Sequence, residues 1–167
     1  MSIVRIPLTQ GQEAVVDEAD WPLISQHHWW AKKSHNLDTF YAYAWIEGAR
    51  TTMHRFLFGN ACSGMHVDHK DGNGLNNRRN NIRLATNAQN ARNRGKSNLK
   101  RIPSSQFKGV TALKGSTRNK WRARIIVNRE FVTVGYFPDE ESAARAYDAA
   151  ALQHFGEFAN LNFPPCA

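Results

Sequence analysis

An aspartate and a histidine are adjacent at Asp68-His69, and two asparagines follow at Asn81 and Asn90. A histidine titrates near neutral pH, so the His69 imidazole can act as a general base on a water molecule. The oxygens of Asp68 and Asn90 are hard ligands, which suit a divalent cation that stabilises charge on a leaving oxygen. Asn81 can orient the imidazole through a hydrogen bond. Together these groups could hydrolyse a phosphodiester.

Basic side chains surround this set and would hold the phosphates of such a substrate. They are Arg78, Arg79, Arg83, Arg92 and Arg94. A purely structural interpretation competes with this one, because Asp-His pairs are common and asparagine-rich stretches often form turns. The residues by themselves leave both interpretations open.

The distribution of charge favours a polyanionic partner. The chain holds 22 Lys and Arg against 14 Asp and Glu, a net charge of +8. Residues 66–105 hold nine basic and two acidic side chains, and residues 106–137 hold seven basic and one acidic. Residues 1–65 and 138–167 are net acidic, at −1 and −4. Two separate basic blocks predict two surfaces that contact double-stranded DNA.

The sequence predicts an α+β fold for the elements that position these residues. Residues 1–52 read as a β-rich N-terminal segment, with an aromatic strand over 39–46. Trp29 and Trp30 are better explained as core or strand-packing residues than as a platform for stacking bases, although that alternative stays open. A short helix is expected from about Thr52 to Phe58, stopped by the Gly-Asn pair that follows.

The segment around the candidate site reads as strand, polar loop, strand and helix. A turn is expected at 71–74, where the sequence is Asp-Gly-Asn-Gly, and a second strand at 82–84. Thr86 and Gln89 have the spacing of a capping box, so a helix should begin there and end at Gly95.

Residues 96–105 have the composition of a basic linker, and a second unit begins near Phe107. In the strand over 120–128 apolar and basic side chains alternate, so the basic ones share one face. A helix follows Pro138, with acidic residues in its first turn. The order is three strands and then one helix. The helix should cover the apolar face of the sheet and leave the basic face open to a partner.

The central motifs resemble those of HNH endonucleases, most closely the homing endonucleases of phage introns and free-standing phage genes. The matching stretches are MHR at 53–55, VDHKDGN at 67–73, NNIR at 80–83 and QNARN at 89–93. The resemblance implies a ββα-metal module over 53–95, with His69 as general base and Asn81 as the central asparagine. It implies one divalent ion, Mg²⁺ or Mn²⁺, held by Asp68 and Asn90. Asn90 replaces the final histidine of the usual motif, which shifts the expected metal toward these two ions.

Residues 106–167 resemble the APETALA-type domain of plant ethylene-response factors. The matching stretches are FKGV at 107–110, KWRA at 120–123, VGYF at 134–137, SAARAYD at 142–148 and LNFP at 161–164. The resemblance implies a three-stranded sheet that lies in the DNA major groove. By position, the DNA-binding residues are Lys108, Arg118, Lys120, Arg122, Arg124 and Arg129. Thr111 and Thr133 replace residues that are often Arg and Trp in the plant domains, so a different target sequence is expected.

The sequence therefore predicts a site-specific DNA endonuclease that acts as a monomer on DNA. No apolar run approaches the length of a membrane span, and two cysteines cannot form a disulfide framework. We expect no membrane partner and a cytoplasmic location in a bacterial host, with the gene carried by a phage or mobile element. The alternatives are a non-catalytic DNA-binding regulator and a non-specific HNH nuclease.

Overall fold

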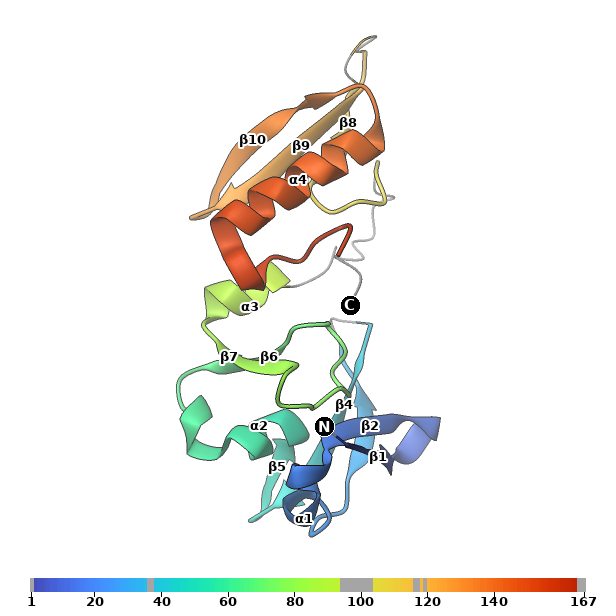
Figure 1. Ribbon diagram of the computed structural model, residues 1–167, viewed down its shortest axis with the longest axis vertical. Coiled ribbons are helices and arrows are strands. Elements are labelled where there is room, and N and C mark those ends of the chain that lie inside the picture. Colours follow the sequence, from blue (N-terminus) through green and yellow to red (C-terminus); the bar gives the residue numbers. More distant parts are fainter. Residues whose placement is uncertain (1, 36–37, 94–103, 116–117, 119, 165–167) are drawn as a thin grey trace. The chain divides into compact units, whose positions relative to one another are not determined.

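The computed structural model describes residues 2–35, 38–93, 104–115, 118 and 120–164. They pack as two compact units, residues 1–90 and 91–167, and the boundary falls inside helix α3 (Asn87–Asn93) (Figure 1). The fold is mixed α/β, with several small antiparallel sheets and four α-helices in the described residues. Gly95 and most of the expected linker lie outside the described residues.

The first unit begins with a hairpin and continues with a three-stranded sheet. Strands β1 (Ile3–Pro7) and β2 (Glu13–Asp17) pair antiparallel. The sheet has the order β3-β4-β5, formed by β3 (Trp30–Lys33), β4 (Phe40–Ile46) and β5 (Ala49–Thr52). A short helix α1 (Trp21–Ile24), which the sequence did not predict, connects the hairpin to β3. Short 3-10 turns occur at Thr9–Gly11, Glu18–Asp20, Gly59–Cys62 and Gly156–Phe158.

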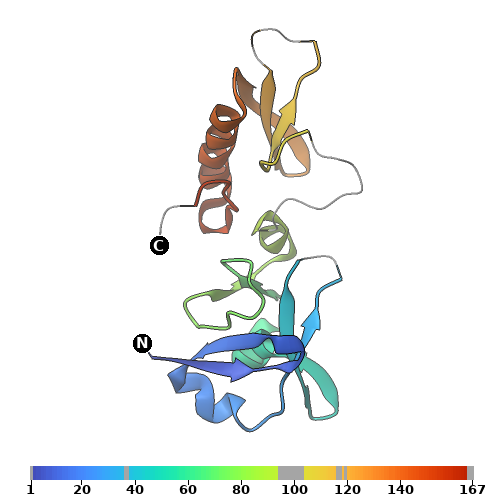
Figure 2. The same cartoon turned by 90° about the vertical axis from the view of Figure 1, so that its right-hand side faces the viewer.

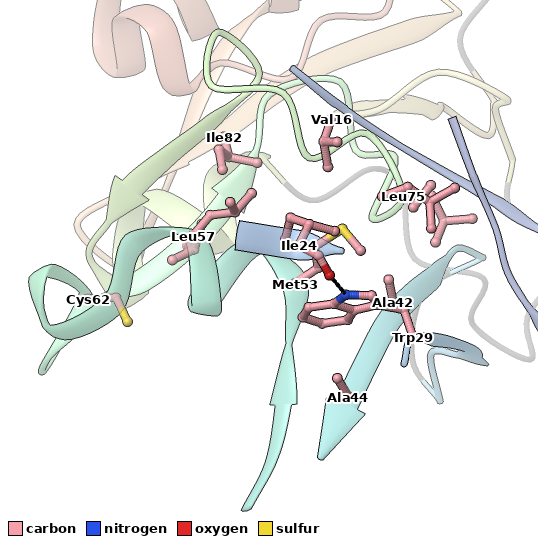
Figure 3. Packing of buried hydrophobic residues seen from close by; sticks show 13 residues of the cluster. Val16, Ile24, Trp29, Ala42, Ala44, Met53, Leu57, Cys62, Leu75 and Ile82 are labelled. Carbon is pink, nitrogen blue, oxygen red and sulfur yellow. Dashed lines mark hydrogen bonds between the residues drawn. The ribbon is translucent and has the colours of Figure 1, made fainter. Parts of the chain in front are cut away.

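The core of the first unit lies between the hairpin, the sheet and helix α2 (Met53–Phe58) (Figure 3). Ile24 and Met53 are fully buried, and Trp29 packs beside them. The indole N–H of Trp29 donates to the carbonyl of Ile24 at 2.9 Å, so its one polar atom is satisfied inside the core. Trp29 is therefore a core residue, as expected.

The candidate site lies on three consecutive elements. Strands β6 (His66–His69) and β7 (Ile82–Ala85) pair antiparallel, and α3 follows directly. The predicted capping box is confirmed: Gln89 donates its backbone N–H to the Thr86 hydroxyl at 3.3 Å, and its side chain accepts from the Thr86 N–H at 2.8 Å. Local hydrogen bonds therefore fix where α3 begins.

The second unit is a sheet with one helix packed along it (Figure 2). Its strands are β8 (Val110–Ala112), β9 (Trp121–Val127) and β10 (Glu130–Phe137), in the order β10-β9-β8. Helix α4 (Glu140–Phe155) is capped by Asp139, whose carboxylate accepts from the Ser142 N–H at 2.7 Å.

The expected alternation in β9 is confirmed, because Ala123 and Ile125 are buried against α4 while Arg122 and Arg124 lie on the other face. Gly109 has a φ of +76°, and a side chain there would overlap the ring of Tyr147. None of the helices in the described ranges is long and apolar enough to cross a membrane.

Candidate active site

Asp68 and His69 are the last residues of β6, and both are buried, with exposed fractions of 6% and 5%. Asp68 lies directly across the hairpin from Arg83. The guanidinium Nε and Nη2 atoms donate to Asp68 Oδ2 at 3.0 and 2.9 Å. A buried carboxylate needs such a partner, because an unpaired charge in the interior is strongly unfavourable.

The imidazole of His69 is oriented by Asn77, a residue that the sequence did not single out. His69 Nε2 lies 3.3 Å from Asn77 Oδ1. The Asn77 amide nitrogen donates to the carbonyl of Leu75 at 3.1 Å, so the oxygen is the atom that faces the ring. A carbonyl oxygen only accepts, so Nε2 must carry the proton and Nδ1 the lone pair.

Burial lowers the pKa of His69, against smaller opposing effects of the Asn77 hydrogen bond and the charges of Asp71 and Asp68. The ring is therefore neutral at neutral pH. A neutral imidazole with a fixed tautomer is the form that can take a proton from water.

Two aromatic side chains pack against the His69 ring. The rings of His54 and His69 meet edge to face, 4.9 Å between centroids, and the Tyr41 ring is 5.9 Å from His69. His54 Nε2 lies 3.0 Å from the Thr52 hydroxyl. Burial, with smaller effects of the charges of His69 and Arg55, lowers the pKa of His54 to about 3. His54 is therefore a neutral residue that supports the ring of His69.

Asn81 closes the loop between the two strands. Its amide donates to Asp71 Oδ1 at 2.9 Å and to the Asn76 carbonyl at 2.7 Å, and its oxygen accepts from the Asp71 N–H at 3.2 Å. We expected Asn81 to contact the imidazole. The structure instead has Asn81 shaping the loop that carries Asn77, and Asn77 makes that contact. Four asparagines lie between 76 and 81, and no local pattern distinguishes the one that reaches His69.

The loop is also held by the N-terminal hairpin. The backbone N–H of Asn77 donates to the Val15 carbonyl at 2.8 Å, and the Val15 N–H donates to the Leu75 carbonyl at 2.9 Å. Arg78 pairs with Asp17 at 3.0 Å.

Arg79 pairs with Asp20 at 2.7 Å. Arg78 and Arg79 were expected at phosphates, and in the structure both anchor this loop. A DNA contact by either one stays a prediction.

The two expected metal ligands lie on different elements of the site. Asp68 ends β6, and Asn90 lies in α3, where its N–H donates to the Thr86 carbonyl at 2.9 Å. A carboxylate and an amide oxygen are the donor types that Mg²⁺ accepts, with water and substrate oxygens completing the shell. The described residues contain no cluster of three or more His, Cys, Asp or Glu side chains that could hold a metal. The donor types of Asp68 and Asn90 therefore suit Mg²⁺, and their role as metal ligands stays a prediction.

The remaining basic residues differ in their surroundings. The Arg92 guanidinium lies 4.7 Å from the centroid of the Phe155 ring, and Arg94 lies outside the described residues. Lys108 is half-buried and donates to the Arg92 carbonyl at 2.8 Å. Burial lowers the pKa of Lys108 to about 8, although the charge of Asp148 opposes this.

The outer face of the second sheet carries two of the predicted DNA-binding arginines. Arg122 pairs across the sheet with Thr111 and Tyr136, and the Arg124 guanidinium lies 4.2 Å from the Phe131 ring centroid. Within the described ranges the buried Nε of Arg122 has no hydrogen-bond partner. The other predicted contacts, Arg118, Lys120 and Arg129, are exposed.

Comparison with known proteins supports the prediction of a nuclease. Residues 55–92 match the family model described as HNH endonuclease. A protein named as an uncharacterized HNH endonuclease of Acanthamoeba polyphaga mimivirus is 34% identical over 158 residues, which cover 92% of this chain and 76% of that protein. This chain belongs to the HNH endonuclease family. The prediction of an HNH nuclease is thereby confirmed, and HNH nucleases generally use a divalent metal ion.

This HNH endonuclease is also similar to plant proteins over part of its length. An AP2/ERF and B3 domain-containing protein of Oryza sativa subsp. japonica is 47% identical over 64 residues, 38% of this chain and 17% of that protein. The APETALA2-like protein 2 of Oryza sativa subsp. indica is 39% identical over 66 residues, 38% of this chain and 14% of that protein. The matched segments cover less than a fifth of each rice protein. No solved structure matches the chain.

Proposed function

We propose that this chain is a site-specific DNA endonuclease of the homing type, which uses one divalent metal and His69 as general base. The observation that carries the proposal is the neutral, buried imidazole of His69, which Asn77 holds and which follows Asp68 directly along β6. A base of fixed tautomer beside a hard ligand is the arrangement that metal-assisted hydrolysis requires.

In the proposed reaction, His69 Nδ1 accepts a proton from the water that attacks the phosphorus. The bond from phosphorus to the 3′ oxygen breaks, and that oxygen takes a proton from solvent water, which leaves 5′-phosphate and 3′-hydroxyl ends. Asp68 and Asn90 would hold Mg²⁺ or Mn²⁺, and that ion supplies charge stabilisation at the leaving oxygen. Asn81 keeps the loop in shape, and Asn77 holds the imidazole in the productive tautomer.

We assign the choice of target to the second unit, residues 106–167. Its sheet presents Arg122 and Arg124 on the face away from α4, where guanidinium groups can donate to the base edges of DNA. We propose that the endonuclease acts as a monomer on double-stranded DNA. A phage or mobile element would carry its gene in a bacterial host, where the protein would be cytoplasmic.

Two other functions compete with this one. A non-catalytic DNA-binding regulator is favoured by the ion pair that engages Asp68 with Arg83. A decayed site should have lost at least one functional residue, and Asp68, His69, Asn81 and Asn90 are all present, which argues against that role. A non-specific nuclease would not need the second unit.

The test is to incubate the full chain with genomic DNA of a candidate host and Mg²⁺ and to map the ends by sequencing. We expect ends at one or few sites, and none with H69A. Cutting at many unrelated sequences would favour the non-specific nuclease. Selective binding without any cutting would favour the regulator.

A further inference from the structure

The sheet β3-β4-β5 has two faces of opposite character. One face carries the buried residues Ala31, Ala42 and Ala44, and Ala42 and Ala44 belong to the core of the first unit. Side chains alternate along a strand, so the cross-strand pairs that lie opposite them share the other face. This outer face consists of Trp30, Lys32, Tyr41, Tyr43, Trp45, Arg50 and Thr52.

Three aromatic side chains of the outer face, those of Trp30, Tyr43 and Trp45, form a cluster. The rings of Trp30 and Tyr43 are stacked, with centroids 6.4 Å apart and planes at 24°. The Trp45 ring is 6.5 Å from that of Trp30, and the Arg50 guanidinium lies 5.3 Å from the Tyr43 centroid. Trp45 is nevertheless 65% exposed. An indole exposed to this extent beside other aromatic rings is a feature of binding surfaces rather than of packing.

The charges of the outer face indicate an anionic ligand. Lys32 and Arg50 contribute two positive charges, and the face contains no carboxylate. Flat aromatic rings combined with cations fit a ligand that is both planar and anionic, which describes unpaired nucleotides. In duplex DNA the faces of the bases are covered by their neighbours, so a stacking surface of this kind suits single-stranded segments.

The outer face is continuous with the candidate active site through Tyr41. Tyr41 and Tyr43 are two residues apart on β4 and share this face. The Tyr41 ring lies 5.5 Å from His54 and 5.9 Å from His69. A side chain at Gly74, in the loop of the active site, would come within 2.6 Å of the Tyr41 ring, so this ring also packs on that loop.

We propose that the outer face binds unpaired nucleotides of the DNA strand next to the cleavage site, with bases stacked on Trp45 and Trp30. The proposal rests on the nuclease function proposed above. Tyr41 connects the outer face to His69, so the DNA that is cut at His69 would also supply the unpaired nucleotides. Two other occupants would have different requirements. A second copy of the chain would make the face a dimer interface. Intact duplex DNA would contact the cations of the face, Lys32 and Arg50, rather than its aromatic rings.

The experiment measures binding by the full chain in EDTA, so that no cleavage occurs. The probes are a labelled oligothymidine, a duplex with a single-stranded tail and the same duplex with blunt ends. W45L removes the stacking ring and keeps an apolar side chain, whereas W45F keeps a ring. W21L is the matched control, since Trp21 is 40% exposed on α1 and lies outside this face.

We expect W45L to weaken binding of oligothymidine and of the tailed duplex by about fivefold or more, the lower end of one base–aromatic stack. W45F should lose much less, and W21L should match the wild type. Binding of the blunt duplex should be unchanged in all three, and their thermal unfolding should coincide with that of the wild type.

Equal binding of the tailed duplex by W45L and the wild type would overturn the proposal. So would an equal loss on blunt duplex, or a change from dimer to monomer in W45L by light scattering. The nuclease function can fail separately. If the wild type cuts no DNA but W45L still loses tail binding, the binding surface stands and the nuclease function falls. If the wild type cuts and W45L binds tails normally, only the surface is wrong.

Discussion

The guanidinium of Arg83 donates two hydrogen bonds to a single carboxylate oxygen of Asp68, directly across the β6–β7 hairpin. Both side chains are buried, and the pair lies one residue from His69. The charge that would bind the metal is thus held in place by a cation of the protein itself. Because both charges are desolvated, each depends on the other far more than an exposed pair would.

R83L should destabilise the first unit by about 3–5 kcal/mol, because it leaves the Asp68 carboxylate buried without its cation. Urea unfolding of the full chain measures the loss. R5A is the control in the same unit, since Arg5 pairs with Glu13 at 2.6 Å in an exposed position. It should cost at most about 1 kcal/mol. Similar losses in the two variants would refute a special role for the buried pair.

H69A should lower the rate of DNA cleavage by about 10²–10⁴-fold while leaving DNA affinity within about twofold of wild type, because a general base acts in the transition state rather than in docking. Single-turnover cleavage and binding in EDTA separate the two effects. H28A, at an exposed histidine, should behave as the wild type. A rate within tenfold of wild type for H69A would remove it from this role.

Removal of the metal or of either expected ligand should silence the enzyme. EDTA should stop cleavage by the wild type. With Mg²⁺ present, the cleavage rates of D68N and N90A should each be lower than that of the wild type by about 100-fold or more. D68N keeps the size of the side chain, so the Arg83 contact is disturbed least. N87A, at an exposed residue of the same helix, is the control. Activity that persists in EDTA would show that the mechanism needs no metal.

N77L should reduce kcat by about 10- to 100-fold with little change in KM, because the imidazole loses the acceptor that fixes its tautomer. N77D should retain more activity, since a carboxylate oxygen can still accept from Nε2. Both variants lose the amide that donates to the Leu75 carbonyl, so they differ mainly in the acceptor offered to His69. If the two variants were equally inactive, the role of Asn77 would be structural only.

R122A and R124A should each lose about 1–3 kcal/mol of binding on the cognate duplex and less on a scrambled one, if these arginines contact base edges. Arg145 is exposed on α4, on the far side of the sheet, and R145A should bind as the wild type. Binding titrations of both duplexes at several salt concentrations distinguish contacts to bases from contacts to phosphates. Equal losses on both duplexes, with the salt slope reduced by about one, would assign the arginines to phosphates.

Features that depend on neighbouring residues could be predicted from the sequence. The capping box of Thr86 and Gln89, the start of α4 after Pro138 and the alternation in β9 are all set within a few residues. Each depends on hydrogen bonds or periodicity that the chain carries locally, so one sequence is enough to find them.

Features that depend on distant pairings were missed. Asn77 is linked to Val15 by the fold, and Asp17 pairs with Arg78 across 61 positions of sequence. Nothing near Asn77 distinguishes it from its neighbouring asparagines. Likewise, the aromatic strand gave no sign that Tyr43 and Trp45 lie on the face away from the core. The packing of the Ala42 and Ala44 face decides that, and it is set only when the sheet folds.

The hydrogen bonds between Val15 and the loop of the active site limit how this nuclease can be transplanted. Excising residues 53–95 as an isolated nuclease module would remove β2, which forms a bridge with that loop at Asn76. It would also remove Asp17 and Asp20, the acidic partners of Arg78 and Arg79. The graft would expose the backbone of Leu75 and Asn77 and loosen the asparagine that orients the His69 ring. A fusion enzyme built from this chain should therefore begin at its N-terminal hairpin.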